Sequence, residues 1–477
     1  MLDMKIEPGE AASRPPAGED WRATHLALSA EDLRFREAAE LDPELLDRSR
    51  FKILDEKQDL VYFHLQSWPT FVGREKLGHM KRVSLAVCNL LRSIPSRIFG
   101  NDPQKLNAFY RLGSPLRAEL VFSPPNGIES SVCRGDFIDT ADGFKCIEFN
   151  FTPNLGGWES TILVGLHQQV PATAAFLDSL DVPWSYPPTL CLFFRHVLSV
   201  LKENRLAGDG EVNVAFMLEP QELEGESDRH QAHFEEELAK ACELEGLQTK
   251  PQVFLCFFQE LEIRQRNIFF RGTQIHAIVE LALGVTTAPV YRAFKTGRVA
   301  LFNGPIEMAL SNKRNVALLS EHESSDLFSP EEREVIRHHI PWSRRIVEGP
   351  VRFRGEEVAL AELLANEKDR LVLKNATSCG GKGVSLGAFT PAAEWEELIQ
   401  TAFASGNWVV QERIESLPYL YQSGKSGCSV HDVIWGPFLF GQTYAGMILR
   451  MQPKADGGAV NLSLTATEGV LLEVDSP

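Results

Sequence analysis

The chain has 477 residues, of which 44% are hydrophobic and 24% are charged, and this balance predicts a folded protein with two or three packed units. Its formal net charge is −17, and it has no stripe of basic residues. Because a phosphate backbone attracts a surplus of lysine and arginine, nucleic acid is excluded as a partner. A small anionic ligand is compatible with this charge, since a few cationic side chains can hold a phosphate inside an acidic protein.

The eight cysteines are scattered along the chain, and no C-x-x-C pair occurs. This pattern argues against a zinc site or a disulfide framework and indicates a reducing compartment. The polar N-terminal segment lacks the apolar core of a signal peptide, and no uncharged run is long enough to span a membrane. The sequence therefore predicts a cytoplasmic protein without a membrane partner, and it leaves the oligomeric state open.

Pro, Gly and polar residues dominate residues 1–20, which we expect to be a disordered tail. Residues 21–120 follow as a helical N-terminal region, because Glu31–Glu40 and Leu77–Ile94 carry apolar residues at helical spacing.

Two short runs of alternating apolar residues come next, at Ser131–Ile138 and Phe144–Phe151. Thr140–Gly143 lies between them and has the composition of a turn, so the two runs predict an antiparallel hairpin.

The middle of the chain is expected to hold a strand at Val212–Leu218, a helix at Arg229–Leu247 and a strand at Val253–Phe258. Strand, helix and strand at this spacing predict a small Rossmann-like unit. A second hairpin is expected around Ile263–Ile278. Later elements are expected at Ala309–Ser320 (helix), Arg370–Lys374 (strand), Pro391–Ala404 (helix), Trp408–Gln411 (strand) and Phe438–Met451 with Ala459–Leu464 (hairpin).

The first candidate site is on the predicted hairpin. Residues two apart in a strand face the same side, so Arg134 and Asp136 share a face, and so do Glu148 and Asn150. Carboxylate and amide oxygens suit Mg²⁺ bound to substrate phosphates, and arginine suits a phosphoryl oxygen. The alternative interpretation is a solvated hairpin face with an ordinary salt bridge.

The second candidate is a strand that ends in Lys374 and runs into Gly380, Gly381, Lys382 and Gly383. Glycines let backbone N–H groups approach phosphate oxygens, and lysine adds positive charge. Neither a Walker A loop nor a dinucleotide fingerprint is present. The alternative is a plain turn between two strands.

Two further segments have weaker signals. An apolar strand breaks into Gln411 and Glu412, as a nucleotide-base hinge requires, although an ordinary buried strand reaching the surface has the same pattern. Lys313 lies near the start of a predicted helix, where the helix N-terminus favours anions, although a surface lysine is the commoner explanation.

Taken together, these segments resemble those of circularly permuted ATP-grasp ligases, such as the synthetase domain of glutathionylspermidine synthase. The Arg-x-Asp and Glu-x-Asn pairs, with twelve residues from Asp136 to Glu148, are similar to the metal-binding hairpin of that family. Asn303–Pro305 with Lys313 resembles its NP…NK segment, and Val410–Glu412 its adenine hinge. The metal residues precede the glycine lid here, which is the mark of the permutation.

The resemblance covers residues 120–470 and implies an α/β (α+β) fold. This fold is a circularly permuted ATP-grasp with an embedded Rossmann-like pre-ATP-grasp unit and a helical N-terminal region. The metal-binding hairpin half is expected at 121–165, the Rossmann-like unit at 166–298, and the nucleotide-binding lid with the remainder at 299–477.

The resemblance also implies roles for the candidate residues. The metal ligands would be Asp136, Glu148 and Asn150, holding one or two Mg²⁺ ions, with Mn²⁺ as a substitute. The ATP-binding residues would be Lys313, Lys374, Gly380, Gly381, Lys382, Gly383, Gln411 and Glu412. Arg134, with Arg450 as a second cation, would stabilise the transferring phosphoryl group.

The implied activity is an ATP-dependent ligation of a carboxylate to an amine through an acyl phosphate. The expected partners are small-molecule carboxylates and amines, such as amino acids, peptides or polyamines. Two alternatives stay open, namely a kinase of a small hydroxyl acceptor on the same fold and a non-catalytic nucleotide-binding homologue.

Overall fold

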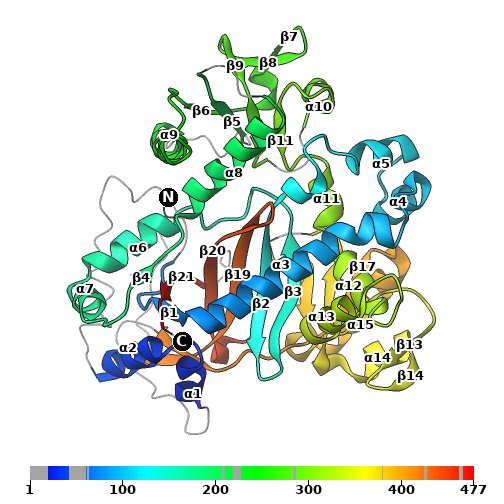
Figure 1. Cartoon of the computed structure of the whole chain (residues 1–477). Coiled ribbons are helices and arrows are strands. Elements are labelled where there is room, and N and C mark those ends of the chain that lie inside the picture. Colours follow the sequence, from blue (N-terminus) through cyan, green and yellow to red (C-terminus); the bar gives the residue numbers. More distant parts are fainter. Residues whose placement is uncertain are drawn as a thin grey trace.

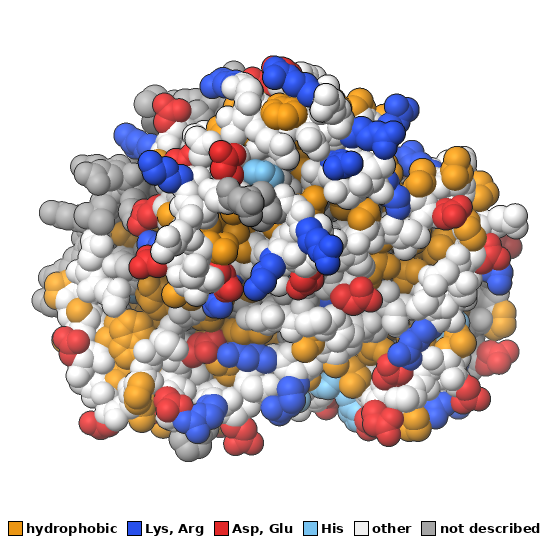
Figure 2. Space-filling model, turned by 45° about the horizontal axis from the view of Figure 1, so that its top comes forward, with side chains coloured by type: hydrophobic (Ala, Val, Ile, Leu, Met, Phe, Trp, Pro, Cys, Tyr) orange, Lys and Arg blue, Asp and Glu red, His pale blue; other side chains and the backbone are white. Residues whose placement is uncertain are grey.

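The structure is a computed structural model that describes residues 20–41, 61, 64–206, 210–218, 227–282, 286–378, 380–423, 427–460 and 466–476. Apart from Asp20, the tail expected at 1–20 lies outside these residues. In the described part of the chain, no helix is long and apolar enough to cross a membrane. On the face seen in Figure 2, basic and acidic side chains are interspersed.

An eight-stranded sheet, called the central sheet, organises the molecule. Its main order is β1 (Thr70–Gly73), β21 (Thr467–Val474), β20 (Thr443–Pro453), β19 (Gly427–Phe440), β2 (Val132–Thr140) and β3 (Gly143–Asn150), with β18 (Tyr419–Ser423) beside β19 and β4 (Trp184–Ser185) beside β21. The predicted hairpin is confirmed as β2 and β3. The predicted helical region 21–120 also contributes β1, which pairs in parallel with β21.

The long helix α3 (Arg74–Arg97) runs across one face of the central sheet (Figure 1). Its Cys88 lies against Cys133 of β2, with the two Sγ atoms 3.5 Å apart. Because side chains alternate along a strand, Arg134 and Asp136 point to the opposite face. Other helices at this end of the chain are α1 (Trp21–Leu26), α2 (Ala30–Leu41), α4 (Pro103–Tyr110), α5 (Pro115–Val121), α6 (Ser160–Gln169), α7 (Pro171–Asp178) and α8 (Thr189–Glu203).

The expected Rossmann-like strands are confirmed within a four-stranded parallel sheet (Figure 1). Its order is β11 (Ala300–Phe302), β10 (Ala277–Glu280), β5 (Asn213–Met217) and β6 (Gln252–Cys256), with α9 (Ser227–Leu244) between β5 and β6 and α10 (Ala288–Lys295) before β11. The strand β11 lies beyond the boundary expected at residue 298.

The hairpin expected around Ile263–Ile278 is wrong in its details. That segment forms a three-stranded meander of β7 (Glu262–Arg264), β8 (Asn267–Phe270) and β9 (Thr273–Ile275), and then enters β10. The two tight turns are made by residues with positive φ, including Gln265, Arg266 and Arg271. Residues other than glycine adopt this conformation only rarely, so Gln265 and Arg266 gave no signal for the first turn, whereas the second turn also contains Gly272.

A four-stranded antiparallel sheet, called the lid sheet, is built by the later part of the chain. Its order is β12 (Ser343–Arg345), β17 (Trp408–Glu412), β15 (Leu371–Asn375) and β16 (Val384–Leu386), and it is accompanied by α14 (Leu360–Asn366), α15 (Ala392–Ser405) and the hairpin of β13 (Pro350–Phe353) and β14 (Glu356–Ala359). The strands expected at Arg370–Lys374 and Trp408–Gln411 and the helix expected at Pro391–Ala404 are confirmed.

The helix expected at Ala309–Ser320 is divided into α11 (Ile306–Leu310) and α12 (Arg314–Glu321), and α13 (Pro330–His339) follows. The break is stabilised by the Asn315 side-chain amide, which donates to the carbonyls of Ala309 and Leu310. Lys313 is therefore the N-cap residue of α12.

The C-terminal hairpin expected from Phe438–Met451 with Ala459–Leu464 is also corrected. The hairpin is formed by β19 and β20, which turn at Gly441 with a φ of 59°. This turn lies inside the run that was expected to be one strand. Residues 461–465 lie outside the described residues, and the next strand in the sheet is β21.

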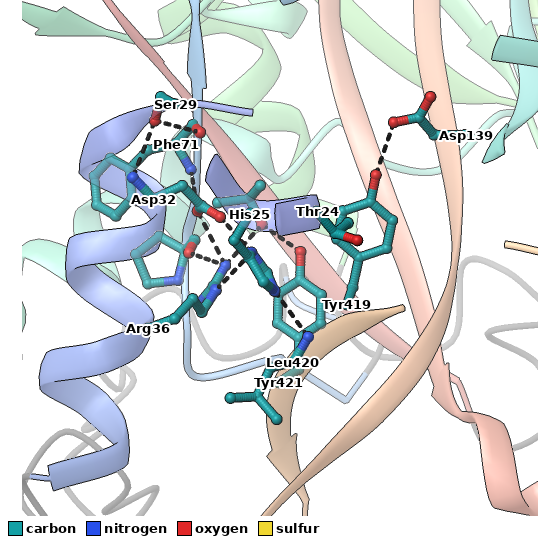
Figure 3. A network of polar contacts seen from close by, with 12 residues as sticks. Thr24, His25, Ser29, Asp32, Arg36, Phe71, Asp139, Tyr419, Leu420 and Tyr421 are labelled. Carbon is teal, nitrogen blue, oxygen red and sulfur yellow. Dashed lines mark hydrogen bonds and ion pairs between the residues drawn. The ribbon is translucent and has the colours of Figure 1, made fainter. Parts of the chain in front are cut away.

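A buried charge network fastens α1 and α2 to the central sheet (Figure 3). Asp32 accepts hydrogen bonds from His25 at 2.5 Å, from Phe71 N at 2.8 Å and from Arg36 at 3.2 Å. The other ring nitrogen of His25 accepts from Leu420 N of β18 at 2.8 Å. Burial lowers the pKa of His25 despite the neighbouring carboxylate, so the ring is a neutral link.

We expect Asp32→Ala to reduce the free energy of unfolding by about 3–5 kcal/mol, because it leaves a buried arginine without its carboxylate. The matched control is Glu37→Ala on the same helix, whose side chain is half-exposed and pairs with Arg22 at the surface. We expect it to change stability by less than about 0.5–1 kcal/mol. Urea unfolding of both variants measures the difference, and equal small losses would show that the network adds little stability.

Candidate active site

A cavity of about 360 Å³ lies between the central sheet and the lid sheet. Its polar lining includes most of the residues predicted from the sequence: Arg134, Asp136, Glu148, Asn150, Lys374, Gly380, Gly381, Gln411, Glu412 and Arg450. Its apolar lining includes Ile138, Val372, Val384, Leu386, Ile414 and Ile434. Side chains from both sheets therefore converge on one space.

Two arginines share the carboxylate of Asp136. Arg450 Nη2 lies 2.6 Å and Arg134 Nε 3.1 Å from Asp136 Oδ1, while the Asn150 amide donates to Oδ2 at 3.3 Å. Burial raises the pKa of Asp136, but the two arginines outweigh it and lower the pKa to about 2. The group therefore carries one net positive charge, counting two guanidinium groups against one carboxylate.

Gly436 makes room for this group. Gly436 is on β19, the strand between β2 and β20. It lies opposite Asp136 of β2, and Arg450 is on the neighbouring strand β20. A Cβ atom on Gly436 would lie 2.7 Å from Ile448 Cγ2 and 3.1 Å from Arg134 Cδ. Only glycine therefore lets the side chains of β2 and β20 meet across the strand between them.

Glu148 forms a salt bridge with Lys313, whose Nζ lies 2.9 Å from Glu148 Oε1. The lysine also donates to the Ser378 carbonyl in the loop that follows β15. Lys313 is buried beside the cavity rather than at its lining. The Lys313 ammonium thus joins the central sheet to the glycine loop, through partners that a bound phosphate could replace.

Lys374 reaches from the lid sheet to the central sheet. Its ammonium donates to the Ile147 carbonyl at 3.0 Å and to Gln411 Oε1 at 2.7 Å. Ile147 is the extra residue of a β-bulge, because Asp136 pairs with Glu148 while Phe137 pairs with Cys146. Burial lowers the pKa of Lys374 to about 8, although Glu148 nearby acts to raise it.

The glycine loop has two distinct parts. Gly380 and Gly381 line the cavity, and both have positive φ. Gly383 closes the turn, because its carbonyl accepts from Asn375 N at 2.8 Å and a Cβ there would lie 2.8 Å from Ser378 Oγ. The side chain of Lys382 is exposed, and Cys379 lies outside the described residues.

The side chains of the predicted base hinge have protein partners. Gln411 accepts from Lys374 and donates to Ser343 Oγ at 3.0 Å, so its amide helps to position the lysine. Glu412 lies 2.6 Å from Arg354 Nη2. Both residues line the cavity, and their role at a nucleotide base stays a prediction.

Sequence reasoning missed the apolar walls and a second loop. Val372 and Lys374 are two residues apart, and so are Val384 and Leu386. Because residues two apart in a strand face the same side, this spacing could have placed all four on one face. Lys454 and Gly458–Val460 also line the cavity. The adjacent glycines Gly457 and Gly458, both with positive φ, were a turn signal for this loop.

The residues present fit a hard cation that shares phosphate oxygens. In the described part of the chain, no three His, Cys, Asp or Glu side chains converge as a metal cluster. Glu148 and Asn150 lie on neighbouring positions of one strand face and both line the cavity, so a carboxylate and an amide group are available there. Mg²⁺ is commonly held by one or two carboxylates together with substrate phosphates, so this small donor set is sufficient.

No protein-family model and no curated protein matches the chain. Among solved structures, it is similar to a glutathione synthetase-like effector from Globodera pallida in its apo form, with a TM-score of 0.53 and 12% identity. The match covers 92% of this chain and 97% of that chain. At this identity the similarity concerns the fold alone, so the chain has a mixed α/β fold similar to that of the glutathione synthetase-like effector.

Proposed function

We propose that the protein is an ATP-dependent ligase that activates a carboxylate as an acyl phosphate and joins it to an amine. The observation that carries this proposal is the cavity between the central and lid sheets, where Lys374, Glu148 and the Arg134–Asp136–Arg450 group meet. The fold similarity supports it, because a glutathione synthetase-like structure spans nearly the same length of chain.

We further propose that the fold is a circularly permuted ATP-grasp. The order of elements supports this, because β2 and β3 carry the acidic residues and precede the lid strands β15 and β17 in the chain.

ATP would place its base among the apolar side chains and its phosphates at the opposite end of the cavity. Val372 and Leu386 of the lid sheet and Ile434 of the central sheet offer apolar walls. Lys374 and Lys313, each of which now binds a protein oxygen, would hold the phosphates. Phosphate oxygens would take over these hydrogen bonds, and the N–H groups near Gly380 and Gly381 would cover them.

Glu148 and Asn150 would hold Mg²⁺ against the phosphates, with Asp136 as a further candidate. A bound Mg²⁺ would neutralise charge on the β- and γ-phosphates. The existing bonds from Asp136 to two arginines and Asn150 favour a positioning role for this carboxylate.

Arg134 and Arg450 would orient the substrate carboxylate and the transferring phosphoryl group. A carboxylate oxygen attacks the γ-phosphorus of ATP, the bond from this phosphorus to the bridging oxygen breaks, and ADP leaves. The amine then attacks the acyl carbon, loses a proton, and inorganic phosphate leaves with the bonding electrons. The residues contribute placement and charge neutralisation, which is how such transfers are accelerated. Amino acids, peptides and polyamines are the proposed substrate classes.

ATP affinity should fall as the pH rises through about 8, because free Lys374 has a pKa of about 8 and only its charged form holds a phosphate. Calorimetric titration of Mg-ATP between about pH 7 and 9 measures this change. Lys374→Ala should bind weakly at every pH. The comparison variant is Lys382→Ala, which also removes one charge but from an exposed side chain, and it should retain the pH dependence. A flat wild-type profile would contradict the assignment of Lys374 to the phosphates.

Glu148→Gln should abolish the contribution of Mg²⁺ to ATP binding, because it replaces a carboxylate ligand with a neutral amide. The measurement is ATP affinity with Mg²⁺ and with EDTA. The wild type should show a clear difference between the two conditions, and the variant almost none. Glu412→Gln is a matched control, since its carboxylate also lines the cavity but pairs with Arg354. Equal Mg²⁺ effects in all three proteins would remove Glu148 from the metal site.

Hydroxylamine should trap the acyl phosphate as a hydroxamate when a cognate carboxylate is present. Arg134→Lys should lower hydroxamate formation about 100-fold or more while changing ATP affinity little, because lysine keeps the charge but loses the planar fork. A colorimetric hydroxamate assay beside a nucleotide titration provides both values.

The same assay separates the proposed ligase from its alternatives. ADP release with a stable phosphorylated product and no hydroxamate would favour a kinase. ATP binding without ADP release across amino acids, peptides, polyamines and hydroxy acids would favour a non-catalytic protein.

A further inference from the structure

Two cysteines from distant parts of the chain meet between α3 and the central sheet, on the face of the sheet opposite the cavity. Cys88 of α3 and Cys133 of β2 are 45 residues apart in sequence, both are fully buried, and their Sγ atoms are 3.5 Å apart. In the described part of the chain, no other two cysteine sulfur atoms are in contact. The scattered spacing of the cysteines gave no signal for this pair, because only the packing of α3 on β2 brings the two thiols together.

A buried cation lies beside the two thiols. Arg92, one turn after Cys88 in α3, is 5% exposed, and its Nη2 atom lies 4.0 Å from Cys133 Sγ. The guanidinium is held in this position because it donates to the carbonyls of Ser131 and Gly441, each at 2.8 Å. A fixed positive charge stabilises a thiolate, so the surroundings of this pair favour thiol chemistry as well as packing.

The two thiols have different roles in this arrangement. The Cys133 thiol donates to the Leu439 carbonyl of β19 at 3.5 Å, and burial raises the pKa of Cys133, so this group keeps its proton. Burial also acts to raise the pKa of Cys88, but the hydrogen bond with Cys133 and the charge of Arg92 outweigh it and lower that pKa. Cys88 is therefore the thiol that reacts first, and Cys133 is the neighbour that can resolve it.

We propose that Cys88 and Cys133 form a reversible disulfide in the presence of a peroxide, and that this bond locks α3 onto β2. The Cys88 sulfur attacks one oxygen of hydrogen peroxide, the O–O bond breaks, and the departing hydroxide takes the proton lost by Cys88. The Cys133 sulfur then attacks the sulfur of the resulting sulfenic acid, the S–O bond breaks, and hydroxide leaves with the proton of Cys133 as a second water. Two thiols are oxidised, and one peroxide is reduced to two waters.

The disulfide joins α3 to β2 one residue before Arg134, and it closes a loop of 45 residues. A cross-link over such a length restricts the unfolded chain and thereby stabilises the folded one. In a reducing compartment the bond is transient, as redox-sensing disulfides there usually are. The proposal does not depend on ligase activity, because its test measures thiols and stability without any substrate.

The test is a map of the thiols of the full chain after incubation with an excess of hydrogen peroxide. Remaining thiols are alkylated in denaturant, and peptide mass spectrometry identifies the protected cysteines. We expect a cross-linked peptide containing Cys88 and Cys133, with the other cysteines alkylated and the cross-link removed by dithiothreitol. Because both thiols are buried, oxidation requires local opening of α3, so urea below the unfolding transition should accelerate it. The Tm of the oxidised chain should be about 4 °C above that of the reduced chain.

Cys88→Ala and Cys133→Ala should each lose the cross-link and the rise in Tm. Cys146→Ala is the matched control and should keep both, since Cys146 is equally buried on β3 but its thiol contacts the Glu148 carbonyl. Alkylation of every cysteine in the peroxide-treated wild type, or a sulfinic acid on Cys88 without a cross-link, would overturn the proposal. The wild-type map gives this answer by itself, so the test remains decisive even if a variant does not fold.

Discussion

The β-bulge at Ile147 is the backbone constraint on which the cavity depends. A regular strand alternates its side chains strictly, so β3 could not otherwise direct both Cys146 and Phe149 to the core beneath α3. One extra residue reverses the alternation and turns Glu148 toward the cavity. The same residue presents its carbonyl to Lys374 of the lid sheet. The bulge thus lets one face of β3 pack in the core, directs Glu148 to the cavity on the other face and provides a contact between the central sheet and the lid sheet.

Several charged side chains of the site are already paired before any ligand arrives, although the cationic groups outnumber the carboxylates. Asp136 is held ionised between two arginines, and Lys313 is paired with Glu148. Lys374 donates to the Ile147 carbonyl and to the Gln411 amide oxygen, and its burial lowers its pKa to about 8. The cationic side chains are therefore fixed in place, and the oxygens of a bound phosphate would replace protein oxygens as their hydrogen-bond partners. Such preorganisation reduces the rearrangement that binding and chemistry require.

Local patterns allowed the β2–β3 hairpin and its four polar residues to be predicted, because a turn and strand alternation suffice to specify them. The partnership of Arg450 with Asp136 could not be predicted, since it depends on a third strand and on the space left by Gly436. The strand β1 was also missed, because its four residues pair with β21 far along the chain. Side-chain partners such as Ser343 for Gln411 likewise depend on tertiary packing.

The parallel pairing of β1 with β21 has a consequence for synthesis on the ribosome. Thr70 pairs with Leu471, so about 400 residues separate the two strands. At translation rates of about 5–20 residues per second, β1 waits about 20–80 s for its partner. During that interval Phe71 and Val72, which are fully buried in the final structure, lack their neighbouring strand. The central sheet therefore closes only after nearly the whole described chain has been made, and chaperones have a long period in which to bind the exposed strand.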